Sequence, residues 1–207
     1  MRIVSLLQDN RVHLSCEIFP PKESARVEEF KQVVQDIAAL GPAYVSVTYG
    51  AAGKTPQFTR ELAQAVQAAG VPALAHLTCI NDTVSKIGDV LDDLEAAGVC
   101  NVLALRGDIP EGASFPQGDH FEHAAELVSY VKKRGGFCVG AACYPEGHPE
   151  AGNRAADLAR LKQKVDAGVD FLTTQMFFDN ATLYNFMYRE LNAGITVPIG
   201  AGVMPVV

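Results

Sequence analysis

The sequence lacks the cysteine pairs that mark a disulfide framework or a zinc site. No C-x-x-C motif occurs, and an odd number of cysteines does not suit a set of disulfides. Each cysteine lies in or beside an apolar run, which indicates buried free thiols. The five positions are Cys16, Cys79, Cys100, Cys138 and Cys143.

Positive charge and long apolar runs are also scarce. The chain has 17 Lys and Arg against 24 Asp and Glu, a net charge of -7, so it offers no broad basic surface for nucleic acid or anionic membranes. No segment reaches the ~18 apolar residues of a membrane span, and the N-terminal residues lack a signal-peptide pattern. We therefore expect a cytoplasmic protein with a small-molecule partner.

What the sequence does contain is a repeated unit of apolar run, polar loop and helix-like segment. With 207 residues, 48% hydrophobic and 20% charged, the chain suits a single folded domain over 1–207. We expect seven strands, at 12–19, 43–49, 72–80, 101–105, 137–144, 169–178 and 197–206.

Six segments between these runs carry apolar residues at helical spacing. They are 23–40, 55–69, 82–97, 120–134, 155–167 and 180–193. Ser24, Thr55, Asp82 and Asn180 are the expected N-caps. A glycine follows each segment, as expected for a left-handed C-cap; these are Gly41, Gly70, Gly98, Gly135, Gly168 and Gly194.

Strands that alternate with helices predict a parallel sheet with right-handed crossovers. The first strand leads into EIFPPKES (17–24) and not into a G-x-G-x-x-G nucleotide fingerprint, which favours a closed barrel over an open sheet. An eight-stranded barrel typically needs ~250 residues. We therefore expect a (β/α)8 TIM barrel whose eighth βα unit is missing from a C-terminally truncated chain.

Polar residues at the carboxyl ends of the strands are the candidate site, because the active sites of such barrels lie there. Glu17 interrupts an apolar strand. If its carboxyl group faces an apolar interior, its pKa should be raised, which suits a general acid. The alternative is an exposed or ion-paired strand residue.

The segment LALRGDIPEG (103–112) places a cation and an anion directly after a strand, where Arg106 and Asp108 would either face a ligand or pair with each other. Tyr144 and His148 lie on a proline-stiffened loop. His148 has no second His or Cys at ligand spacing, so we expect no metal. Gln175 ends another strand and can read a heteroaromatic edge.

The ordered motifs resemble those of the methylenetetrahydrofolate reductase family across essentially the whole chain. They are CEIFPPK (16–22), YVSVTYGA (44–51), AHLTCI (75–80), NVLALRGDIP (101–110), AACYPEGHPEA (141–151), LKQKVDAG (161–168) and TTQMFFD (173–179). The resemblance implies a flavin oxidoreductase in one-carbon metabolism and methionine biosynthesis, homo-oligomeric when full length. It would reduce 5,10-methylenetetrahydrofolate to 5-methyltetrahydrofolate by ping-pong hydride transfer, with non-covalent FAD as cofactor and NADH or NADPH as electron donor.

The resemblance also assigns roles to residues. Glu17 matches the general acid, Asp108 a carboxylate near flavin and pterin, and Gln175 a residue that contacts folate and nicotinamide, so these three are the expected catalytic and substrate-binding residues. The expected cofactor contacts are Thr48, Tyr49, Ala51, His76, Arg106, Gly107, Asp108, Ala124, Tyr144, His148, Ala151, Asp157 and Lys164.

The chain departs from the family pattern at Arg160 and Gln163, where the family has Asn and Arg. It also lacks the family's later aromatic loop residue and the tyrosine of an eighth strand. One alternative is a non-catalytic truncated barrel that binds FAD weakly or serves as a pterin-binding module. Another is a pterin-dependent methyltransferase barrel without flavin.

Overall fold

The computed structural model describes residues 1–21, 23, 26–49, 56–80, 82–109 and 118–204. Within these ranges, strands and helices alternate along the chain. The strands are β1 (Cys16–Ile18), β2 (Val45–Val47), β3 (Ala73–Thr78), β4 (Asn101–Leu105), β5 (Cys138–Cys143), β6 (Phe171–Thr174) and β7 (Ile199–Gly200). The helices are α1 (Ile3–Leu6), α2 (Val27–Ala39), α3 (Pro56–Ala68), α4 (Val84–Ala96), α5 (Ala124–Arg134), α6 (Arg154–Asp166) and α7 (Asn180–Asn192).

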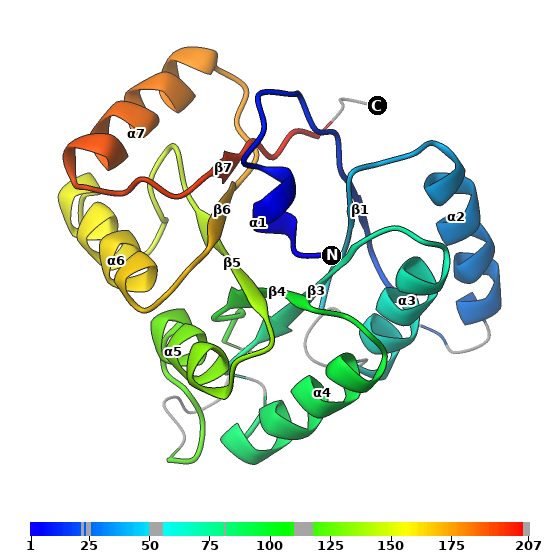
Figure 1. The fold of residues 1–207 in the computed structure, drawn as a ribbon. Helices are drawn as coiled ribbons and strands as arrows, with labels where there is room; N and C mark the ends of the chain where they lie inside the picture. The colour runs from blue at the N-terminus through cyan, green and yellow to red at the C-terminus, as the bar shows by residue number, and fades with distance from the viewer. Residues whose placement is uncertain (22, 24–25, 50–55, 81, 110–117, 205–207) are drawn as a thin grey trace.

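The strands form one parallel sheet in the order β1-β2-β3-β4-β5-β6-β7. The sheet curves, and α2 to α7 lie on its outside (Figure 1). No pairing joins β1 to β7 among the described residues, so these two strands are its edges. The prediction of a barrel-type α/β fold with seven strands is confirmed, because every strand neighbours the next one in sequence.

The helix ends follow local chemistry, with small shifts from the prediction. Thr83, and not Asp82, caps α4 by accepting a hydrogen bond from the backbone N–H of Lys86. Asp179, and not Asn180, caps α7. Ser24 and Thr55 lie outside the described residues. The six glycines predicted after the helices all have positive φ, between 70° and 117°, a region that favours glycine. Gly135 departs from the predicted left-handed cap, because its ψ is -177°.

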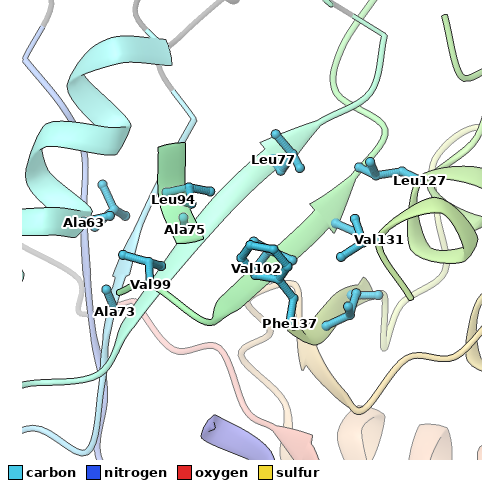
Figure 2. Packing of buried hydrophobic residues seen from close by; sticks show 14 of the residues in the cluster. Ala63, Ala73, Ala75, Leu77, Leu94, Val99, Val102, Leu127, Val131 and Phe137 are labelled. Atoms are coloured by element: carbon cyan, nitrogen blue, oxygen red, sulfur yellow. The ribbon is translucent and has the colours of Figure 1, made fainter. Parts of the chain in front are cut away.

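The larger part of the core fills the layer between the sheet and the helices. Ala73, Ala75 and Leu77 of β3 point into this layer and are fully buried. Figure 2 shows them with Val102 of β4 and with side chains of the surrounding helices. Burying this apolar surface is the main favourable contribution to folding.

A second, smaller cluster fills the inside of the curved sheet. Phe171 and Leu74 lie here with Ile3 of α1, a helix that the sequence patterns did not predict. The side chain of Asn101 ties α1 in place: it accepts a hydrogen bond from the Ile3 N–H (2.8 Å) and donates to the Met1 carbonyl (3.1 Å). The helix therefore covers the end of the sheet at which the strands begin.

The cysteines are free thiols, as predicted, but the predicted burial holds for only three of the five. Cys79, Cys138 and Cys143 are buried, and Cys16 and Cys100 are partly exposed. Within the described ranges, none of the helices has the length and apolar character needed to cross a membrane.

Candidate functional site

Three polar side chains meet on the inner face of β1, β2 and β3. In parallel strands alternate residues face opposite sides. The outward neighbours Ile18, Val45 and Val47 belong to the outer core, so Glu17 and Ser46 face inward. The Ser46 hydroxyl lies 3.2 Å from Glu17 Oε2 and 2.7 Å from His76 Nε2. Glu17 Oε2 and His76 Nε2 are themselves 3.4 Å apart.

This cluster corrects the expected electrostatics of Glu17. Its side chain is 46% exposed, and the hydrogen bond from His76, aided by that from Ser46, lowers the pKa of the carboxyl group against the effect of burial. The prediction of a raised pKa is therefore wrong, because polar partners and solvent replace the apolar enclosure that it assumed. The alternative of an exposed, paired strand residue describes this carboxylate better.

A cavity of about 370 Å³ opens beside the ends of β4, β5 and β6. It brings together five of the predicted site residues: Arg106, Asp108, Tyr144, His148 and Gln175. The remaining lining residues are Pro145, Glu146, Gly147, Pro149, Glu150 and Met176. Its volume lies in the range of small-molecule pockets and is large enough for part of a dinucleotide.

Arg106 forms a bidentate ion pair with Glu150. Its Nη1 lies 2.6 Å from Glu150 Oε2 and its Nη2 lies 2.7 Å from Oε1. The considered pairing of Arg106 with Asp108 is not the one found among the described residues. Gly107 follows with φ 90°, and a Cβ atom there would lie 3.1 Å from Thr78 Cβ, so the chain turns tightly against β3 at this point.

The β5 loop is fixed by ring and backbone contacts. Tyr144 and His148 stack edge to face with ring centres 4.7 Å apart. The His148 backbone N–H donates to Asp157 of α6 (3.2 Å), and Ala151 N–H donates to the His148 carbonyl (2.9 Å). Lys164 reaches from α6 to donate to the Ala142 carbonyl (2.6 Å), and burial lowers the pKa of its ammonium group.

A second network of hydrogen bonds and ion pairs lies just after the carboxyl end of β2. The Tyr49 hydroxyl donates to Asp82 Oδ2 (2.6 Å), and Asp82 also pairs with Lys86. Desolvation, with the hydrogen bond to Asp82, raises the pKa of the Tyr49 phenol, which therefore stays protonated. The Thr48 carbonyl accepts from Thr59 (2.9 Å).

Two of the predicted cofactor contacts take no part in the cavity or the networks described above. Ala51 lies outside the described residues. Ala124 begins α5 and is not among the described residues that line the cavity.

Sequence patterns missed Ser46, Asp82 and Glu150. Ser46 had a usable signal, because it is an inward polar residue within a buried strand. Glu150 had none, since only the folded loop brings it to Arg106. No group of three or more potential metal ligands occurs in the described part of the chain.

Comparison with known sequences gives a consistent result. The methylenetetrahydrofolate reductase family description matches residues 2–207. "Methylenetetrahydrofolate reductase (NADH) 1" of Zea mays is 39% identical over 99% of this chain and 37% of its own length. "5,10-methylenetetrahydrofolate reductase" of Escherichia coli (strain K12) is 36% identical over 95% of this chain and 65% of its own length. The chain thus spans less than two thirds of these curated relatives.

Solved structures resemble the fold at low sequence identity. A protein from Clostridium thermocellum, described as binding two copies of 5-methyl-5,6,7,8-tetrahydrofolic acid, has a TM-score of 0.62 and 15% identity over 95% of this chain and 68% of its own. A 2,3-dimethylmalate lyase has a TM-score of 0.66 and 9% identity over 98% of this chain and 73% of its own. These likenesses concern the fold, whereas the sequence match from residue 2 to residue 207 is the stronger finding: the chain belongs to the methylenetetrahydrofolate reductase family.

Proposed function

We propose that this chain carries the catalytic residues for FAD-dependent reduction of 5,10-methylenetetrahydrofolate to 5-methyltetrahydrofolate. NADH or NADPH would be the electron donor, in a cytoplasmic pathway that leads to methionine. The observation that carries the proposal is the family match over residues 2–207, because it includes every strand that holds a candidate residue. We further propose that residues 1–207 act as one domain of a homo-oligomeric protein.

The donor groups around the cavity suit the diphosphate and ring systems of FAD. Arg106 offers a guanidinium group, and Tyr144 with His148 offers aromatic surfaces. Asp157 holds the loop backbone next to them. Lys164 of α6 donates to the Ala142 carbonyl of β5 and is not among the described residues that line the cavity. When bound, FAD would accept a hydride from the nicotinamide and return it to the folate.

Glu17 is the proposed proton donor to the folate nitrogen that leaves the methylene bridge. Because hydrogen bonds lower its pKa, the resting carboxylate is ionised at neutral pH and must receive a proton before it can donate one. Ser46 bridges Glu17 and His76, so its hydroxyl offers a path by which a proton can reach Glu17.

Asp108 and Gln175 are the proposed pterin contacts. Both line the cavity. The Gln175 backbone N–H donates to the Cys143 carbonyl (2.7 Å). This hydrogen bond extends the β5–β6 pairing and holds the Gln175 backbone in place. A carboxylate can stabilise positive charge that develops on the pterin, and an amide can both donate to and accept from its ring edge.

The test separates the two half-reactions. The chain is loaded with FAD, and flavin absorbance is followed on addition of NADH and then of methylenetetrahydrofolate. We expect bleaching with NADH and recovery with folate. Glu17→Gln should keep the first step and lose the second, whereas Glu28→Gln, which alters an exposed carboxylate of α2, should keep both.

A chain that binds no FAD but still binds folate would instead be a pterin-binding module. Equal loss of both half-reactions in Glu17→Gln would refute the role given to Glu17.

A further inference from the structure

All three nitrogens of the Arg106 guanidinium group are already occupied within the chain. Nη1 and Nη2 donate to the two oxygens of Glu150, and Nε donates to the Gly107 carbonyl (3.2 Å). A guanidinium group forks onto a carboxylate in the same way as onto a phosphate. Glu150 therefore holds the face of Arg106 that an anionic ligand would use.

The carboxylate of Glu150 is held loosely enough to leave. Its side chain is 57% exposed, against 26% for Arg106. Its backbone is anchored separately, because its N–H donates to His148 Nδ1 (3.1 Å). The hydrogen bond from Arg106 lowers the pKa of Glu150, so the group stays charged at neutral pH. The side chain can rotate into solvent while the loop keeps its place.

The charges around the cavity make the Arg106–Glu150 pair important for the binding of anionic ligands. Arg106 is the sole Lys or Arg among the described residues that line the cavity, whereas Asp108, Glu146 and Glu150 are all acidic. A ligand with a phosphate group that enters the cavity meets a neutralised cation and two further negative charges. Its binding free energy is therefore reduced by what is needed to separate Arg106 from Glu150.

We propose that the Glu150 carboxylate competes with the diphosphate of the bound dinucleotide for Arg106, and that it leaves Arg106 when the ligand binds. The inference rests on the proposed function for the identity of the ligand as FAD. Glu150 then lowers the affinity of the cavity for anionic ligands and selects among them by their charge. A diphosphate, with its higher charge, displaces the carboxylate from Arg106, whereas a ligand with a single carboxylate does not.

Equilibrium binding to the 207-residue chain tests the proposal, with FAD, ADP, inorganic pyrophosphate and riboflavin as probes. Glu150→Gln keeps the shape of the side chain and removes its charge. We expect it to tighten binding of the three phosphate-bearing probes about fivefold, the scale of a partly exposed ion pair, and to leave riboflavin binding unchanged. Glu28→Gln is the control, since it removes the charge of an exposed carboxylate of α2 that does not line the cavity; its effect should stay below about twofold.

A second comparison uses Arg106→Gln. This change should weaken binding of the phosphate probes and should abolish the gain from Glu150→Gln when the two are combined. Unchanged or weaker ADP binding in Glu150→Gln would overturn the proposal and make Glu150 a support that orients Arg106. If ADP and pyrophosphate respond as expected but FAD does not bind, the competitor role stands and the proposed function fails. If no phosphate probe binds to either protein, the competitor role is refuted.

Discussion

Glu190 of α7 should make the chain less stable as the pH rises through neutrality. Its side chain is 1% exposed, and neither carboxylate oxygen has a hydrogen-bond partner among the described residues. It borders a groove of about 640 Å³. The other lining residues are Tyr184, Met187, Tyr188, Leu191, Ile195, Thr196, Val197 and Ile199. Burial in these surroundings raises the pKa of Glu190 from 4.5 to about 7, with only Arg189 opposing the shift.

The direction follows from which state binds the proton more tightly. Between pH 4.5 and about 7 the folded chain keeps the Glu190 proton and the unfolded chain releases it, so the free energy of unfolding falls as the pH rises. Below this window the contribution is fully present, and above pH 7 it has been lost. The difference in pKa corresponds to about 3 kcal/mol in total, of which about 2.5 kcal/mol falls between pH 5 and pH 8.

Urea unfolding of wild type and Glu190→Gln at pH 5 and pH 8 measures this contribution. The glutamine is neutral at both values, so the variant should lack the loss of about 2.5 kcal/mol and should be the more stable protein at pH 8. Glu28→Gln is the control, because its carboxylate is 82% exposed and solvent screens its pair with Lys31.

The reasoning fails if wild type and Glu190→Gln lose the same free energy of unfolding between the two pH values. Such a result would mean that the carboxylate finds water or a cation in solution. A loss shared by Glu28→Gln and wild type but absent from Glu190→Gln is the expected pattern.

Two further predictions concern the inside of the sheet. Gly140→Ala should reduce the free energy of unfolding by about 1 to 3 kcal/mol, because its Cβ would lie 2.5 Å from Phe171 Cζ. Gly152→Ala, with open space around the added methyl group, should stay within about 0.5 kcal/mol. Asn101→Ala should cost about 2 kcal/mol, since it leaves the buried Ile3 N–H without its acceptor. A value near zero in urea unfolding would show that α1 does not depend on Asn101.

Much of the fold could be predicted from sequence periodicity and glycine placement. The seven apolar runs each contain a strand, and six of the helices lie where apolar residues recur at helical spacing. The first helix escaped prediction because it has only four residues, and its stability comes from Ile3 and Asn101, which are 98 residues apart. No local pattern carries such a contact.

Several residues of the candidate site were predicted from the sequence, but their pairings were not. Glu17 could be singled out because it interrupts an apolar strand and Gln175 because it ends one, and loop composition indicates Tyr144 and His148. The sequence could not show that the Ser46 hydroxyl would contact both Glu17 and His76. Nor could it show that Arg106 would pair with Glu150 and not with Asp108. These choices depend on strand register and loop conformation, which only the packed sheet determines.

The attachment of α1 has a consequence for the order of folding. Residues 1–3 cannot reach their final partners until β4 has been made, because their hydrogen bonds go to Asn101, almost half the chain away. Closing so long a loop is slow and is favourable only once the strands provide the surface that α1 covers. During synthesis the first helix should therefore dock late, and a sequence fused to Met1 should delay the sealing of the interior around Phe171 more than the pairing of β1 with β2.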